Sequence, residues 1–112
     1  MKRFEEIIAW QKAKELAVFI YRIFRANRDY GFRDQIQRAV VSIGNNIAEG
    51  FERQSDKELK QFLFIAKGSC GEVRSMTYLA QDLGYLKEQE SVVIRDSAQE
   101  ISRMLAGFIK KL

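Results

Sequence analysis

The spacing of the apolar residues constrains the fold of this chain more than any other feature. Near the C-terminus these residues recur at alternating steps of four and three, at Ile94, Ala98, Ile101, Leu105, Phe108 and Leu112. Such steps bring side chains onto one face of an α-helix, so the segment is predicted to be an amphipathic helix. The 112 residues contain no proline, which would break helix interiors, and long helices are therefore favoured throughout.

The first half of the chain predicts two more helices. One runs from Phe4 to about Ala26, and its apolar positions include Ile8, Leu16, Ile20, Ile23 and Phe24. Asn27 to Gly31 contains turn-forming residues and predicts its end. The next helix is expected from near Phe32 to Gly50, with one apolar face made of Ile36, Val40, Ile43 and Ile47. Its segment Gly44 to Asn46 is rich in poor helix formers, so tertiary contacts must compensate for them.

The start of the third helix is marked by Ser55 and Glu58, which have the spacing of a capping box. Its apolar face then consists of Leu59, Phe62, Leu63, Ala66, Cys70, Val73, Thr77 and Ala80, and Gly84 is a predicted C-cap. The connection Gly84 to Gln89 leads into the last helix. Four such helices joined by short connections pack most readily as an antiparallel up-down-up-down four-helix bundle. We therefore predict an all-α fold, with residues 1–112 as a single domain.

The residue types that most metal and redox sites need are scarce. The chain has no histidine and one cysteine, Cys70, so zinc, copper, haem and carboxylate di-iron sites cannot be assembled from one copy. Cys70 lies in the apolar stripe of the third helix and is predicted to be a buried structural thiol. We expect no metal, no cofactor and no enzymatic activity, and a lone cysteine favours the cytoplasm.

The charge and the hydropathy of the chain limit which kinds of partner are expected. Lys and Arg number 19 against 15 Asp and Glu, and the net charge of +4 is a weak indication of a polyanionic partner. No signal peptide is readable at the N-terminus. The longest uncharged stretches, such as Ala39 to Ala48, fall far short of the roughly 20 apolar residues that cross a bilayer, so no integral membrane protein is expected.

Two polar stripes are candidates for binding. On the second helix, helical steps bring together Arg38, Ser42, Asn46, Glu49 and Arg53. This stripe is either a solvated face with a Glu49–Arg53 ion pair or a polar network or binding surface. On the third helix, a basic stripe consists of Lys57, Lys60, Lys67 and Arg74, all within roughly 100° of one another. Asp56 and Asp82 partly offset its charge. This basic stripe is either a solvated face or a surface that tracks phosphates.

The third helix has two further unusual features. Its mid-helix segment Gly68 to Gly71 does not have the context of a phosphate-binding loop, so we expect it to mark close helix packing. Apolar character also extends beyond one face, at Ile65, Met76, Tyr78, Leu79 and Leu83. A monomeric bundle would leave much of this surface in water, and we therefore predict an oligomer.

Two runs of sequence resemble the four-helix-bundle family of 23S ribosomal RNA intervening-sequence proteins. They are RAVVSIGNNIAEG, from Arg38 to Gly50, and FLFIAKGS, from Phe62 to Ser69. Further positions similar to the family are Trp10, Ala13, Leu16, Tyr21, Glu72, Leu83, Gly84, Tyr85 and Leu86. The resemblance covers about residues 4 to 86, and the last helix matches only in character. The family often has proline where this chain has Gly44.

The resemblance implies an antiparallel bundle that assembles into a ring-like homo-oligomer, commonly a pentamer, without known enzymatic activity. Similarly folded accessory proteins of diversity-generating retroelements bind nucleic acid and a reverse transcriptase, so RNA or DNA is the implied partner. Our first hypothesis is phosphate contact without base readout through Arg38, Arg53, Lys57, Lys60, Lys67 and Arg74. The alternative is a protein-interaction scaffold or accessory subunit that makes no contact with nucleic acid.

Overall fold

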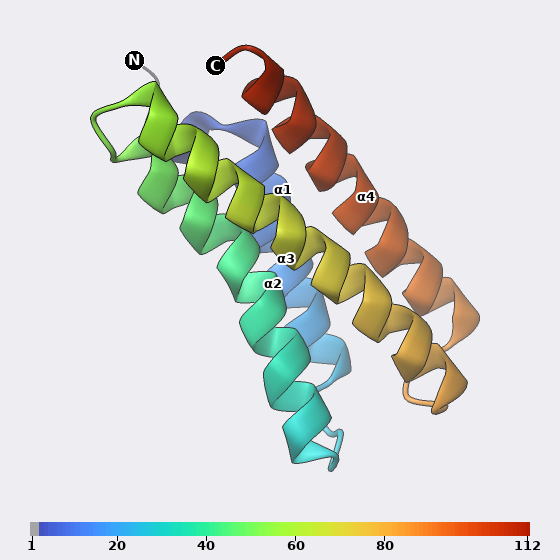
Figure 1. Cartoon of the computed structure of the whole chain (residues 1–112). Coiled ribbons are helices and arrows are strands. Elements are labelled where there is room, and N and C mark those ends of the chain that lie inside the picture. The colour runs from blue at the N-terminus through green and yellow to red at the C-terminus, as the bar shows by residue number, and fades with distance from the viewer. Residues whose placement is uncertain (1–2) are drawn as a thin grey trace.

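The computed structural model describes residues 3–112 and is helical throughout its regular structure. A short 3₁₀-helix, η1 (Phe4–Glu6), precedes four α-helices: α1 (Ile8–Ile23), α2 (Tyr30–Phe51), α3 (Asp56–Asp82) and α4 (Glu88–Lys110). Successive helices run in opposite directions along a bundle of 43 × 20 × 20 Å (Figure 1). The predicted all-α fold, an up-down-up-down four-helix bundle, is confirmed.

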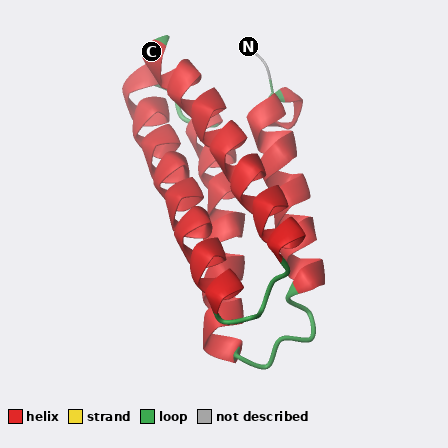
Figure 2. Cartoon of the chain, turned by 90° about the vertical axis from the view of Figure 1, so that its right-hand side faces the viewer, coloured by secondary structure: helices red, strands yellow, loops and turns green. Residues whose placement is uncertain are grey.

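The helices form a square in cross-section. Each packs on its neighbours in the sequence, and α4 closes the square against α1. In the described part of the chain, α1 therefore lies diagonally opposite α3, and α2 opposite α4. Figure 2 shows the short loops that join the helices at the two ends of the bundle. A side chain of α3 can consequently face the core, α2, α4 or the outside.

The core is built by the predicted apolar stripes. All of the predicted positions of α2 are fully buried, and so are Ile94, Ala98, Ile101 and Leu105 of α4. Leu63, Ala66, Cys70, Val73, Thr77 and Ala80 line the buried side of α3. One position of the first stripe is wrong, because Ile8 is 52% exposed. Ile7 and Ala9 are buried beside it instead.

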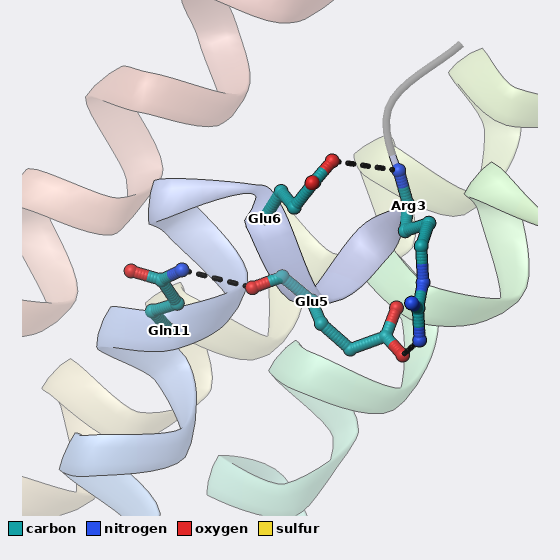
Figure 3. Close-up of polar contacts among 4 residues, drawn as sticks. All are labelled: Arg3, Glu5, Glu6 and Gln11. Atoms are coloured by element: carbon teal, nitrogen blue, oxygen red, sulfur yellow. Dashed lines mark hydrogen bonds and ion pairs between the residues drawn. The ribbon is translucent and has the colours of Figure 1, made fainter.

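The N-terminal segment departs from the single helix that the sequence predicts. The backbone at Ile7 is extended (φ −78°, ψ 121°), which separates η1 from α1 and buries Ile7. Side chains stabilise the break, as Figure 3 shows. The Arg3 backbone N–H donates to the Glu6 carboxylate at 3.3 Å, and Gln11 Nε2 donates to the Glu5 carbonyl oxygen at 2.8 Å. Phe4 then packs edge-on against Trp10.

The start of α2 lies two residues before the predicted position, at Tyr30. Asp29 is its N-cap, since its carboxylate accepts the backbone N–H of Phe32 at 3.2 Å. The same carboxylate accepts the Tyr85 hydroxyl at 2.7 Å, and this bond, with the Phe32 N–H, lowers the pKa of Asp29. Asp29 thereby ties the start of α2 to the connection between α3 and α4.

The predicted ends of α3 are largely confirmed. Ser55 Oγ accepts the Glu58 backbone N–H at 3.2 Å, but the Glu58 carboxylate bonds to the Ser55 hydroxyl and not to its backbone N–H. The capping box is therefore only half formed. At the other end Gly84 has φ +78°, and the Tyr85 N–H donates to the Ala80 carbonyl. This is the glycine-terminated helix end that the sequence predicts.

Candidate nucleic-acid interface

Three members of the basic stripe, Lys60, Lys67 and Arg74, form one row along α3. They are seven residues apart, so the row rises by about 10 Å per step and turns by only about 20°. Each residue is partly buried, which is typical of long side chains whose stems lie on the bundle while their charges reach water. We call these three residues the basic row. Lys57 is exposed at the start of α3 and is rotated by about 60° from Lys60.

The basic row lies on the side of α3 that faces α4. Tyr78 and Gln81 share this side of the helix with Arg74, from which they are four and seven residues away. Both contact Arg95 of α4: the guanidinium lies 4.4 Å from the Tyr78 ring centre, and Nη1 donates to Gln81 Oε1 at 3.0 Å. The row therefore follows the outer edge of the α3–α4 contact.

Among the described residues, no carboxylate forms an ion pair with the basic row. In residues 3–112 the ion pairs are Arg3–Glu5, Lys12–Glu100, Arg33–Asp34 and Arg53–Glu49. None involves Lys60, Lys67 or Arg74. Three cations in line over about 21 Å of helix, without carboxylate partners, make a surface that attracts phosphates.

The two arginines of the α2 stripe lie elsewhere, and Arg53 lies beyond the last residue of α2, Phe51, so the predicted stripe continues past the end of the helix. Arg53 Nη2 is 3.1 Å from Glu49 Oε1, and its guanidinium lies 4.8 Å from the ring centre of Phe62. Arg38 is exposed beside a hollow of about 400 Å³. The hollow is lined by Tyr21 of α1 and by five residues of α2: Arg38, Val41, Ser42, Asn45 and Asn46. The Glu49–Arg53 ion pair predicted for a solvated face is thus present.

The middle of the α2 stripe is a polar network that joins two helices. Asn46 Nδ2 donates to the Ser42 carbonyl oxygen at 2.8 Å and to Ser42 Oγ at 2.9 Å. Ser42 Oγ is 2.9 Å from Ser69 Oγ on α3, and either hydroxyl can donate. Ser42 and Asn46 therefore hold α2 to α3, which gives this part of the stripe a structural role.

Exposed apolar residues separate the two sets of basic residues. Phe64, Ile65, Leu79 and Leu83 are 49 to 55% exposed and point outward from α3, and we call them the outer apolar face. The α2 stripe lies on one side of this face and the basic row on the other. The six candidate phosphate-binding residues therefore do not form one surface. Met76, which was predicted to belong to the extended apolar surface, is instead buried at 8% exposure.

Two predictions about glycine are changed by the structure. Nothing in the described chain lies within 4 Å of a Cβ added at Gly68 or Gly71, so the close packing expected of this segment is wrong for its two glycines within one chain. Ser69 between them does contact α2, through Ser42. Both glycines point outward, next to the outer apolar face. The close approach occurs at Gly50, where a Cβ would lie 2.9 Å from Cβ of Phe62 and 3.0 Å from Cδ1 of Leu59.

Sequence reasoning missed Arg95 as a functional candidate. Its Nη1 also donates to Ser91 Oγ at 2.7 Å, so the guanidinium is held by two hydrogen bonds while it packs on Tyr78. No spacing rule could reveal this cluster, because its members come from two helices on either side of a loop. The exposed tyrosine near the end of a basic stripe was the only available signal.

The cysteine is a candidate nucleophile, and the carboxylates are candidate metal ligands. Cys70 is fully buried, as predicted, and burial raises the pKa of its thiol to about 12 although the charges of Lys67 and Arg74 act to lower it. Within residues 3–112 no three potential metal-ligating side chains come together in a cluster. No helix of that part is long and apolar enough to cross a membrane.

Comparisons with known proteins agree with this architecture. The crystal structure of a protein of unknown function from the S23 ribosomal protein family of Bacteroides thetaiotaomicron VPI-5482 is similar, with a TM-score of 0.86 and 27% identity. The alignment covers 92% of this chain and 99% of that one. No curated protein matches the chain. The family described as 23S rRNA-intervening sequence protein matches residues 5–107. The chain therefore belongs to the family of 23S rRNA-intervening sequence proteins.

Proposed function

We propose that this protein binds RNA or DNA by contacting phosphates with Lys60, Lys67 and Arg74. The observation that carries the proposal is the alignment of these three cations on one side of α3 without a carboxylate partner among the described residues. Each phosphate contact releases condensed counterions from the nucleic acid, which favours binding at low salt. Contacts of this kind fix the position of a strand but do not read its sequence.

We further propose that the protein acts by binding and not by catalysis. The chain has no histidine to serve as a general base, and its one thiol is buried with a pKa of about 12. A thiol in that state is protonated at neutral pH and is a poor nucleophile. The single free cysteine also suits a reducing compartment, which supports the cytoplasm as the location.

Our proposal includes assembly into a homo-oligomer through the outer apolar face. Phe64 and Ile65 form one exposed apolar pair on the outward side of α3, and Leu79 and Leu83 form a second pair about 20 Å further along the helix. Large exposed apolar side chains on one side of a helix are typical of an interface, and a closed symmetric ring covers them in every copy. The family resemblance favours five copies. A ring would repeat the basic row around its circumference and would strengthen polyanion binding through multivalency.

The outer apolar face also supports a second candidate, a scaffold that binds another protein and no nucleic acid. A pull-down treated with nuclease separates the two functions. A captured protein that remains bound after nuclease treatment favours the scaffold. Loss of the captured material after nuclease treatment favours nucleic-acid binding.

The direct test is fluorescence anisotropy with labelled RNA and DNA at about 50 mM salt, where phosphate contacts are strongest. We expect the full chain to bind both. The variant Lys60→Gln, Lys67→Gln and Arg74→Gln should lose about tenfold or more in affinity. A control, Lys14→Gln, Arg22→Gln and Arg25→Gln, removes the same charge from exposed positions of α1, which lies diagonally opposite α3, and of the turn that follows α1. No binding by the wild type, or equal loss in both variants, would contradict the proposal.

A further inference from the structure

Tyr78 is an exposed aromatic ring at one end of the basic row. It lies one helical turn beyond Arg74 on the same side of α3, and 55% of the residue is exposed. The guanidinium of Arg95 lies 4.4 Å from the ring centre and covers one face of the ring. Although Arg95 covers one face of the ring, more than half of the residue remains exposed.

The Arg95 guanidinium that lies against this ring is held by hydrogen bonds. Arg95 Nη1 donates to Gln81 Oε1 at 3.0 Å and to Ser91 Oγ at 2.7 Å, which ties the guanidinium to both α3 and α4. A ring that rests on an immobilised cation loses little conformational freedom when another planar group packs on its free face. Such a ring is prepared to stack, in contrast to an exposed tyrosine that moves freely.

A second exposed tyrosine provides a comparison within the same chain. Tyr30 is 58% exposed, and the guanidinium of Arg33 lies 4.8 Å from its ring centre. This pair lies in the first turn of α2, away from the basic row. The two tyrosines share exposure and an arginine neighbour, and they differ in whether a line of unpaired cations leads up to the ring.

We propose that Tyr78 is a stacking platform for an unpaired nucleobase, so that the nucleic acid held by the basic row is single-stranded. The inference rests on the proposed function, and it adds the class of ligand. Proteins that hold single strands combine a positively charged track for the backbone with aromatic rings on which bases stack. Lys60, Lys67 and Arg74 supply the track, and Tyr78 supplies the ring at its end. The bases of a duplex are stacked on each other and cannot occupy the ring.

The test compares a single strand of about 20 nucleotides with a strand of the same length in which every base is missing, because stacking needs bases while phosphate contacts do not. The wild type should bind the base-bearing strand more tightly. Tyr78→Leu should weaken that binding by about fivefold or more and should leave the abasic strand and a duplex unaffected. Tyr78→Phe keeps the ring and should bind like the wild type. Tyr30→Leu is the matched control and should also bind like the wild type.

The outcomes separate this inference from the proposed function. If the wild type binds strands but Tyr78→Leu keeps its full preference for bases, the stacking site is wrong and the phosphate-binding function stands. Equal affinity of the wild type for base-bearing and abasic strands would overturn the stacking site in the same way. If the wild type binds no nucleic acid at all, the proposed function and the stacking site both fail.

Discussion

The inward and outward sides of α3 differ in how far other residues of the same chain bury their apolar side chains and pair their polar groups. Inward, Cys70, Val73 and Thr77 are fully buried, and the Thr77 hydroxyl donates to the Val73 carbonyl oxygen at 2.6 Å. Outward, Ile65 and Leu79 leave about half of their surface in water. The inward side is complete within one copy, whereas the outward side is where we propose that partners bind.

The outward side is itself divided. The outer apolar face suits a surface that excludes water, and the basic row beside it suits a polyanion that remains hydrated. In the function that we propose, this one helix would contribute to two contacts at once, with a second copy and with a nucleic acid. Changes confined to one part should leave the other intact.

The largest expected effect is loss of assembly when the outer apolar face is charged. In the variant Ile65→Glu and Leu79→Glu, a carboxylate at each site would have to be buried without a partner for copies to associate. Light scattering coupled to size exclusion should show a mass near 13.0 kDa for the variant and about five times that for the wild type. A control, Val18→Glu and Val93→Glu, adds the same charge at exposed sites of α1 and α4 and should keep the wild-type mass. A wild-type mass of one chain at micromolar concentration would refute the oligomer.

The next effect compares a glycine that another helix approaches with glycines that face outward. Gly50→Ala places a Cβ 2.9 Å from Cβ of Phe62, so α2 and α3 must shift, at a cost of about 1 to 3 kcal/mol in the free energy of unfolding. Gly71→Ala meets no atom of this chain and should be neutral or stabilising by up to about 1 kcal/mol. Urea unfolding measures both variants. Gly68→Leu should also cost little within one copy, so a large loss there would mean that a partner packs on Gly68.

The smallest effect concerns alkaline pH and the buried thiol. In the unfolded chain Cys70 ionises near the ordinary thiol pKa of 9.0, while burial raises the pKa of the folded thiol to about 12. The contribution of this thiol to stability is fully present below pH 9 and is lost as the pH rises toward 12. By pH 10 the loss amounts to roughly 1 kcal/mol. The difference in unfolding free energy between wild type and Cys70→Ala should therefore be smaller at pH 10 than at pH 8. A constant difference between the two proteins would mean that the thiol ionises equally in both states.

The sequence predicted the parts of the fold that depend on periodicity. The apolar faces of α2 and α4 repeat regularly, and the buried residues follow them. It failed where a local contact breaks the pattern, as at Ile7, whose extended backbone is stabilised by contacts around η1. Gly68 was misjudged because a glycine has the same appearance in sequence whether its face meets a helix or water.

The candidate site was predictable only in part. The basic row follows from a seven-residue spacing and could be read directly. The separation of Arg38 and Arg53 from that row depends on how α2 packs against α3, which spacing along one helix does not reveal. Arg95 was missed for a related reason, since its partners Tyr78 and Gln81 lie on another helix. Contacts between helices decide which residues share a surface.

The salt dependence of binding tests the central claim most directly. Each lysine or arginine that neutralises a phosphate adds about 0.7 to 0.9 to the slope of log K against log salt concentration. The variant Lys60→Gln, Lys67→Gln and Arg74→Gln should therefore have a slope smaller by about 2 than the wild type. The control variant Lys14→Gln, Arg22→Gln and Arg25→Gln should keep the wild-type slope. An unchanged slope in the basic-row variant would show that these three side chains only face solvent.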